Sequence, residues 1–188
     1  MSTQTFSPTA LVATENIAEV RAQRLTDAAQ QWGNNIQQDP ANATLTFAIN
    51  ATSIGSVATE IDTGKHSFLI DEPAGLAGDD AGASPVEYAL GAIAACQQVV
   101  YRLYAHRLGI QVDDVQIRAE GNLDVHGLFG LDESVRPGFT DVSLKVSITG
   151  PESAERYREL QEKVDAHCPV LDLFANPTPV NVDLEVNA

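Results

Sequence analysis

The sequence predicts an α+β fold in which an antiparallel sheet packs on a long, buried central helix. The first observation is an alanine-rich stretch of helical length in the middle of the chain. The second is a set of short segments, before and after this stretch, in which apolar residues alternate with polar ones. Strands and helices do not follow one another in the regular order of βαβ units, so an antiparallel sheet is expected.

The central helix has the clearest boundaries. Ser84-Pro85-Val86-Glu87 forms a capping box with proline at the first helical position, and Gly109 after Leu108 is a typical helix end. No charged residue occurs between Tyr88 and Tyr101. Because a helix that is apolar on nearly every side is usually buried on nearly every side, we predict a buried helix with Cys96 near its middle.

The remaining elements follow from the same periodicity. Period-two alternation predicts strands at residues 43–51, 56–61, 66–70, 110–123, 139–149 and 180–186. Helical spacing predicts a first helix over residues 14–32, which ends at Gly33, and a later helix from Pro151 that Pro169 breaks or restarts. We therefore expect a helical extension at residues 1–40 and a main domain at residues 41–188.

Length and charge exclude several classes of function. The chain has 188 residues, of which 44% are hydrophobic, enough for one domain with a real core. Its 11 basic and 26 acidic residues give a net charge of −15, which argues against binding to nucleic acid or to an anionic membrane surface. The N-terminus has no basic start followed by an apolar run, so a cytoplasmic protein with reduced thiols is expected.

Cys96 and Cys168 are the only cysteines, and they lie 72 positions apart. They form no CxxC motif and no zinc-ligand pattern with histidine, so we expect neither a metal nor an organic cofactor. Each could simply be a small buried residue, because free cysteine is often found in protein cores. Alternatively, the helix after Pro151 could dock on the central helix and bring the two sulfurs together.

Glu87 is a candidate with two interpretations. It occupies the N3 position of the capping box, where its carboxylate would bond back to Ser84. It precedes Cys96 by nine residues, about 13–14 Å along the helix axis, so it cannot touch that thiol within one helix. It could still face an arginine at the mouth of a pocket.

Several of these segments together resemble the OsmC/Ohr family, and the broader OsmC-like group more closely than the Ohr branch. They are Ser84 to Glu87, the small-residue helix with Ala94-Ala95-Cys96, the loop that reaches Pro137-Gly138-Phe139, and His167-Cys168-Pro169-Val170. The resemblance implies an intertwined homodimer whose cysteine helices are enclosed by sheets of both chains. It also implies that organic hydroperoxides are reduced, with Cys96 as the peroxidatic thiol and Cys168 as the resolving thiol.

Two positions depart from the peroxidase branches of that family. Those branches carry an arginine in the loop between the first two strands, where this chain has Ser53-Ile54-Gly55-Ser56. They also place a glutamate directly after the proline, where this chain has Val86 and the glutamate comes one position later. Arg136 is therefore our first candidate for the cation near Cys96, and Arg24 is the second.

The sequence leads to one predicted function and one alternative. The prediction is a thiol-dependent peroxidase for defence against oxidative stress, which acts on organic hydroperoxides and is reduced again by a dithiol. The alternative is a non-catalytic dimeric module of the same fold that binds an apolar ligand or a protein partner. In a third, purely structural interpretation, both cysteines are only packing residues.

Overall fold

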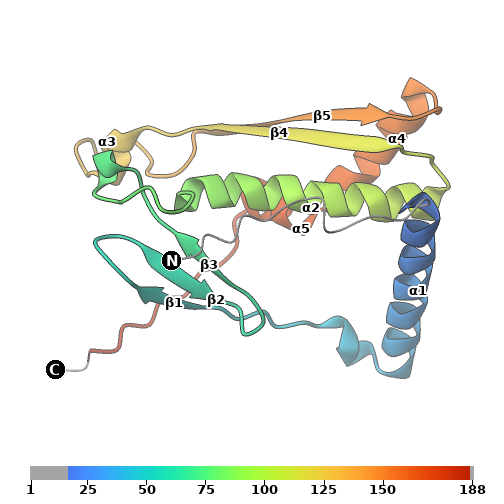
Figure 1. Ribbon diagram of the computed structural model, residues 1–188, viewed down its shortest axis with the longest axis horizontal. Helices are drawn as coiled ribbons and strands as arrows, with labels where there is room; N and C mark the ends of the chain where they lie inside the picture. The colour runs from blue at the N-terminus through green and yellow to red at the C-terminus, as the bar shows by residue number, and fades with distance from the viewer. Residues whose placement is uncertain (1–16, 187–188) are drawn as a thin grey trace. The chain divides into compact units, whose positions relative to one another are not determined.

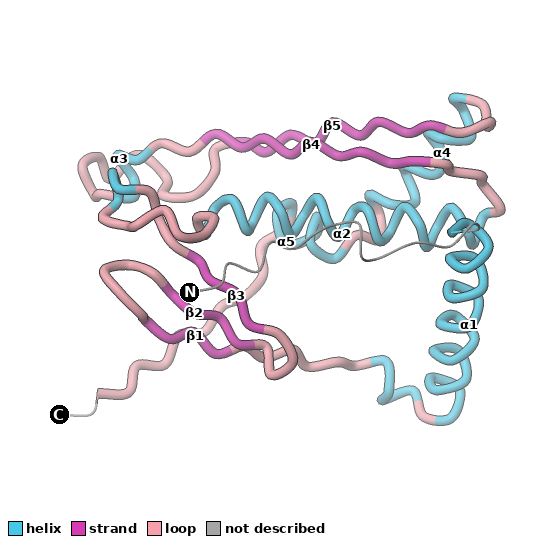
Figure 2. Tube along the Cα trace, viewed as in Figure 1, coloured by secondary structure: helices cyan, strands magenta, loops and turns pink. Residues whose placement is uncertain are grey.

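The computed structural model describes residues 17–186, which divide into two compact units (Figures 1 and 2). One unit ends at Phe47 and the other begins at Ala48. The structure is α+β with antiparallel sheets, as the sequence predicts. No helix among the described residues is long and apolar enough to cross a membrane.

The first unit contains helix α1 (Ile17–Gln38) and the short 3-10 helix η2 (Pro40–Ala43). The prediction that the first helix ends at Gly33 is wrong, because α1 continues to Gln38. A single glycine weakens a helix by only about 1 kcal/mol, whereas the residue before a proline is driven away from helical backbone angles. Asp39 is that residue, and its side chain caps η2 by accepting the N–H of Ala41 at 2.9 Å.

The central helix α2 (Pro85–Leu108) has the boundaries that the sequence predicts. The Ser84 N–H donates to Glu87 Oε2 at 2.8 Å, and the Glu87 N–H donates to Ser84 Oγ at 3.4 Å, which completes the capping box. At the other end Gly109 adopts a left-handed conformation with φ of 62°, and its N–H caps the last turn.

Only one side of α2 is covered within the chain. The buried residues recur every three or four positions and are Ile93, Gln97, Val100, Tyr101 and Ala105. The exposed side carries small and apolar residues, which we call the exposed stripe of α2: Ala92, Ala95, Val99 and Leu103. The expectation that this helix is covered on nearly every side is therefore not met within one chain.

Three elements cover the buried side of α2. The antiparallel hairpin of β4 (Asp114–Asn122) and β5 (Asp141–Thr149) runs along the helix (Figure 1). Helices α4 (Ala154–Asp165) and α5 (Pro169–Ala175) also pack against it. The resulting core consists of Val100, Tyr101, Ala105, Ile110, Val115, Leu160, Val164 and Cys168.

A second sheet precedes α2 in the chain. β1 (Asn50–Ser53), β2 (Thr59–Asp62) and β3 (Ser67–Ile70) form an antiparallel meander. The ring of Phe68 in β3 stacks on Tyr88 of α2 with centroids 5.1 Å apart, and the Tyr88 hydroxyl donates to the Leu69 carbonyl at 3.0 Å. These contacts join the sheet to the beginning of α2.

The acidic loop between β3 and α2 is folded around one buried carboxylate. Asp71 Oδ2 accepts the N–H groups of Asp79 and Ala81, each at 3.0 Å. A Cβ atom on Gly78 would lie 1.7 Å from the Glu72 carbonyl oxygen, so only glycine fits there. The loop also contains the 3-10 helix η3 (Ala74–Leu76).

Element ends differ from the sequence predictions by a few residues where local capping decides them. The helix predicted from Pro151 begins instead at Ala154, because the Ser153 side chain caps it by accepting the Arg156 N–H at 3.3 Å. As predicted, Pro169 starts a new helix, α5. The loop between β4 and β5 contains the one-turn helix α3 (Val125–Leu128).

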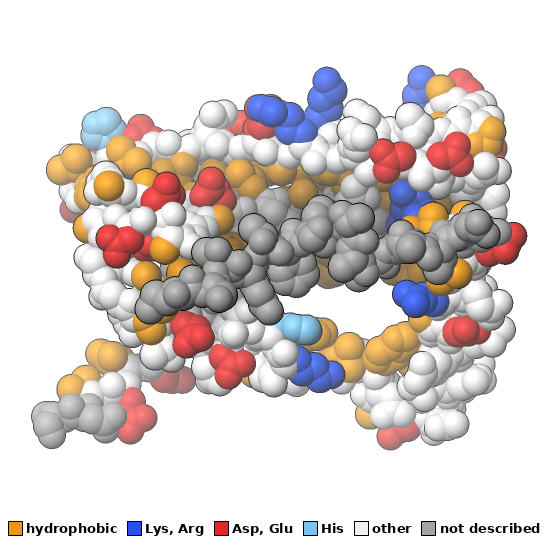
Figure 3. All heavy atoms as spheres, viewed as in Figure 1, with side chains coloured by type: hydrophobic (Ala, Val, Ile, Leu, Met, Phe, Trp, Pro, Cys, Tyr) orange, Lys and Arg blue, Asp and Glu red, His pale blue; other side chains and the backbone are white. Residues whose placement is uncertain are grey.

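One predicted strand, and most of another, pair with no strand among the described residues. Residues 44–49 and 177–186 keep the alternation of a strand, yet neither pairs with a described strand. Their apolar side chains are strongly exposed, with Phe47 at 89% and Val182 and Leu184 at 87%, and such side chains are visible on the C-terminal segment in Figure 3. A strand needs the edge of a neighbouring strand for its hydrogen bonds. Periodicity therefore mispredicted the strand at residues 180–186 and the first part of the strand at residues 43–51, whose last residues, Asn50 and Ala51, do pair in β1.

We expect Ser84→Ala to lower the free energy of unfolding by about 0.5–2 kcal/mol, because α2 would lose its N-terminal cap. Chemical denaturation followed by circular dichroism measures this change. Ser67→Ala, at an exposed position of β3, is the matched control and should leave stability nearly unchanged. Equal stability of the two variants would contradict the capping role.

Candidate active site

Cys96 and Cys168 come together in the folded chain. Cys96 lies in the middle of α2 and is partly exposed, whereas Cys168 immediately precedes α5 and is 2% exposed. Both are free thiols, the side chain of Cys96 packs against the core that contains Cys168, and Cys96 lies near enough to raise the pKa of Cys168. The structure therefore contains a pair of neighbouring thiols, one of them accessible.

The break between α4 and α5 positions Cys168. The N–H of His167 bonds to the Val164 carbonyl at 3.1 Å in a tightened last turn of α4. The carbonyl of Cys168 then accepts the N–H of Asp172 at 3.0 Å, the first bond of α5. Pro169 has no N–H to continue α4, so the chain turns at Cys168 and faces this side chain toward α2.

The environment of Cys168 keeps its thiol protonated. Burial raises the pKa of Cys168 above its usual value, and the neighbouring Cys96 raises it further. The N–H groups of Leu171 and Val170 at the start of α5 act in the opposite direction and lower it. Because the net shift is upward, Cys168 is a neutral thiol at pH 7.

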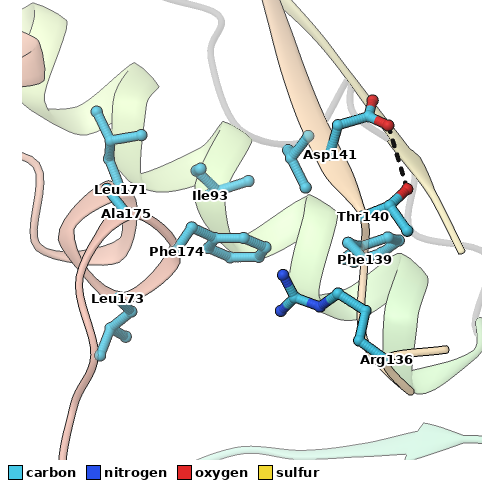
Figure 4. A pocket seen from close by; sticks show the side chains of 10 residues that line it. Ile93, Arg136, Phe139, Thr140, Asp141, Leu171, Leu173, Phe174 and Ala175 are labelled. Carbon is cyan, nitrogen blue, oxygen red and sulfur yellow. Dashed lines mark hydrogen bonds between the residues drawn. The ribbon is translucent and has the colours of Figure 1, made fainter. Parts of the chain in front are cut away.

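An open pocket of about 400 Å³ is lined by Ile93 of α2 and by residues of α5, the helix that follows Cys168 (Figure 4). Its lining is mainly apolar, and its walls come from α2, α5 and the start of β5. The lining residues are Ile93, Arg136, Phe139, Thr140, Asp141, Val142, Leu171, Leu173, Phe174 and Ala175. Ile93 precedes Cys96 by three residues, about one turn of α2, so the pocket and the accessible thiol share a side of the helix.

Arg136 is the cation of this pocket. Its side chain points toward the rings of Phe139 and Phe174, which line the same pocket and whose centroids are 6.5 Å apart (Figure 4). Among the described residues, Arg136 has no ion pair or hydrogen bond through its side chain. On the pocket wall Thr140 donates to Asp141 at 3.2 Å. The pocket thus combines an apolar wall with one positive charge that no described residue pairs.

A second cleft, of about 420 Å³, is lined by Cys168 itself. Its lining is more polar and includes Asp165, His167, Asp172 and Asn176, while Leu171 lines both clefts. The Nδ1 atom of His167 donates to the Lys163 carbonyl at 2.7 Å. Cys168 thus lines the polar cleft, and Leu171, three residues later, lines both the polar cleft and the apolar pocket.

The other two predicted site residues are Glu87 and Arg24. The Glu87 carboxylate is engaged with Ser84, and the Ser84 N–H holds the pKa of Glu87 below its usual value. Arg24 is an exposed residue of α1, in the unit that ends at Phe47. Among the described residues, no group of histidine, cysteine and acidic side chains is arranged to hold a metal ion.

Sequence reasoning missed the apolar walls of the pocket. Ile93 is three residues before Cys96 and Leu171 is three residues after Cys168, so helical spacing from each cysteine was a usable signal for both. Phe139 and Phe174 had no such signal, because they meet only through the packing of α5 near the start of β5.

The sequence model of the OsmC-like protein family matches residues 78–183 of this chain, more than half of its length. The chain belongs to the OsmC-like protein family. This confirms the resemblance seen in the sequence. No curated protein has a significantly similar sequence.

Solved OsmC-like structures share the fold. The OsmC-like protein from Mycoplasma pneumoniae is 19% identical with a TM-score of 0.60, over 69% of this chain and 87% of that one. An organic hydroperoxide resistance protein from Legionella pneumophila is 22% identical with a TM-score of 0.55, over 70% and 90%. One from Elizabethkingia anophelis is 23% identical with a TM-score of 0.54, over 70% and 91%.

We expect iodoacetamide to alkylate Cys96 at least tenfold faster than Cys168 at pH 7, since Cys168 is buried and its raised pKa leaves little thiolate. The rate at Cys168 should increase as pH rises through its elevated pKa. Peptide mass spectrometry of timed samples measures both rates. In a denaturant the two rates should converge, and a tenfold preference that persisted there would show that the fold is not its cause.

Proposed function

We propose that this OsmC-like protein is a thiol peroxidase that reduces organic hydroperoxides. Cys96 is the peroxidatic thiol and Cys168 the resolving thiol. The observation that carries the proposal is that a partly exposed thiol, Cys96, packs against the core that contains the buried thiol of Cys168. An apolar pocket is lined by Ile93, one turn before Cys96, and by Leu171, three residues after Cys168. Solved relatives named as organic hydroperoxide resistance proteins support the same chemistry.

The catalytic cycle has two steps that oxidise the thiols and one step that reduces them again. The thiolate of Cys96 attacks the terminal oxygen of the hydroperoxide, the O–O bond breaks, and the alcohol leaves after it takes up a proton. The product is a sulfenic acid on Cys96. The thiol of Cys168 then attacks this sulfur, which forms a disulfide and releases water. A dithiol reductant restores both thiols by exchange and is itself oxidised to a disulfide.

The pocket suits the alkyl part of the substrate, and Arg136 suits its reacting end. Burial of an alkyl chain against Ile93, Phe139 and Phe174 contributes about 0.8 kcal/mol per CH₂ and favours alkyl over hydrogen peroxide. The Arg136 guanidinium stabilises negative charge on the thiolate or on the departing oxygen. Arg24 is the second candidate for this role.

Two features support a homodimer as the working form. The exposed stripe of α2 presents alanines that allow another backbone to approach closely, next to Val99, which is 59% exposed. The extended segments 44–49 and 177–186 carry the apolar alternation of strands without a described partner strand. A second copy of the chain would cover the stripe and supply edges for both segments.

The alternative function is a dimeric module that binds an apolar ligand and does not turn it over. The absence of an arginine in the turn between β1 and β2, at Ser53 to Ser56, favours this alternative. In that case Phe139, Phe174 and Leu171 bind the ligand, and the thiols react only slowly. The same pocket serves both functions, so the reactivity of the thiols separates them.

We expect the reduced protein to lose two thiols per chain rapidly when it is mixed with cumene hydroperoxide. Cys168→Ser should lose one thiol and accumulate a sulfenic acid, because no resolving thiol remains. Cys96→Ser should lose none at that rate. Stopped-flow measurement with a thiol titration records the kinetics. Slow loss in the wild-type protein would reject the peroxidase and leave the binding module.

In the same assay, Arg136→Met should slow the oxidation of Cys96 at least tenfold, about 1.4 kcal/mol of barrier. Arg118→Met is the matched control, because Arg118 is exposed on β4 and paired with Glu120 at 2.6 Å. Arg24→Met tests the second candidate. If Arg24 supplies the positive charge near Cys96, oxidation of Cys96 will be slow in Arg24→Met and not in Arg136→Met.

We expect sedimentation of the folded protein at micromolar concentration to give a dimer. Replacement of Val99 by aspartate would put a charge on the exposed stripe of α2 and should shift the equilibrium toward monomer. Glu60→Lys, at an exposed position of β2, is a control that also alters charge. A stable monomer of the wild-type chain would contradict the proposal.

A further inference from the structure

A buried polar cluster lies next to the thiol pair and has no place in the peroxide chemistry. Gln97, the residue after Cys96, is completely buried, and its Nε2 donates to Asp165 Oδ1 at 3.3 Å. Tyr101 lies one turn further along the same side of α2 and is 1% exposed. Asp165 is the last residue of α4 and precedes Cys168 by three residues.

The cluster is poorly explained as a stabilising feature. Gln97 Oε1 and the Tyr101 hydroxyl are buried and have no hydrogen-bond partner among the described residues. Buried polar atoms without partners destabilise a fold, and leucine and phenylalanine would fill the same two positions without this cost. A glutamine in the buried stripe of α2 therefore calls for a reason other than stability.

The single hydrogen bond of Gln97 supplies that reason. It joins the α2 turn that carries Cys96 to the end of the helix that leads to Cys168, across 68 residues of sequence. Burial raises the pKa of the Tyr101 phenol, and the nearby Asp165 charge raises it further, to about 12. The Asp165 carboxylate is thus drawn against α2 although the residue itself is exposed.

We propose that Gln97 and Asp165 are positioning residues that hold the α4–α5 junction, and with it Cys168, against Cys96. Their hydrogen bond fixes the separation at which the two sulfurs form a disulfide. The role of that disulfide rests on the proposed function, but the positioning itself does not require peroxide. It is a property of the two thiols in the folded chain.

The test measures how readily the two thiols form a disulfide at equilibrium. The full chain is equilibrated with mixtures of reduced and oxidised glutathione. When Cys96 and Cys168 form their disulfide, one molecule of oxidised glutathione becomes two molecules of reduced glutathione. Mass shifts after thiol alkylation give the oxidised fraction. Gln97→Leu should lower the equilibrium constant for the bridge at least tenfold, which raises its reduction potential by about 30 mV.

Matched variants separate positioning from general damage. Gln98→Leu makes the same change on the next residue, whose side chain donates to the Val115 carbonyl of β4, and should leave the equilibrium constant within about twofold of wild type. Asp165→Ala removes the same hydrogen bond from the exposed partner and should match Gln97→Leu. Asp165→Asn keeps an acceptor oxygen and should restore most of the loss.

The pair must also behave as one unit. The double variant Gln97→Leu with Asp165→Ala should be no worse than either single variant, because both remove one contact. Denaturation should show that Gln97→Leu is as stable as wild type, and if that variant fails to fold, Asp165→Ala carries the test alone. Unchanged bridge formation in Asp165→Ala, additive losses, or no bridge in the wild-type protein would overturn the inference.

Failure of the proposed function gives a different result. In one outcome the wild-type protein forms its disulfide in the glutathione mixtures, Gln97→Leu forms it less readily, and the wild-type protein still reacts slowly with cumene hydroperoxide. That result supports the positioning role of Gln97 and Asp165 and rejects the peroxidase. If Cys96 reacts rapidly with peroxide and all variants form the disulfide equally well, the peroxidase proposal stands and the positioning role of Gln97 and Asp165 is rejected.

Discussion

The packing of one side of α2 is the constraint on which the rest of this structure depends. Ile93, Gln97, Val100, Tyr101 and Ala105 recur at helical spacing and are covered by β4, α4 and α5. Because α4 lies along this side, its end brings Cys168 to the turn that carries Cys96. The pocket arises from the same packing, since its walls are the part of α2 before Cys96, the helix after Cys168 and the start of β5.

The opposite side of α2 is left exposed within one chain. The helix exposes Val99 and Leu103 beside two alanines, and two strand-like segments expose alternate apolar residues. Apolar surface of this extent is rarely left in water, so the exposed parts mark where the proposed second copy would bind. In that arrangement the thiols are organised within each chain, and the partner encloses the helix that carries Cys96.

Arg136 has no acidic partner among the described residues, although the chain is strongly acidic. The chain carries 26 acidic residues, yet the pocket beside the thiols holds an arginine whose side chain pairs with none of them among the described residues. An unpaired cation beside aromatic rings is available to a negative charge that appears during a reaction. For this reason Arg136 is the first candidate for the cation that stabilises the Cys96 thiolate. The turn between β1 and β2 has no arginine for this role.

The sequence by itself determined the features that depend on neighbouring residues. The capping box at Ser84 and the glycine end at Gly109 bound α2, and the order of helices and strands follows from periodicity, which repeats locally. Only the tertiary structure decided which side of α2 is covered, that segment 177–186 pairs with no described strand, that Cys96 packs against the core that contains Cys168, and that Gln97 bonds to Asp165. These depend on contacts between residues far apart in the chain, which local pattern does not encode. Strand pairing in particular requires an edge that another segment supplies.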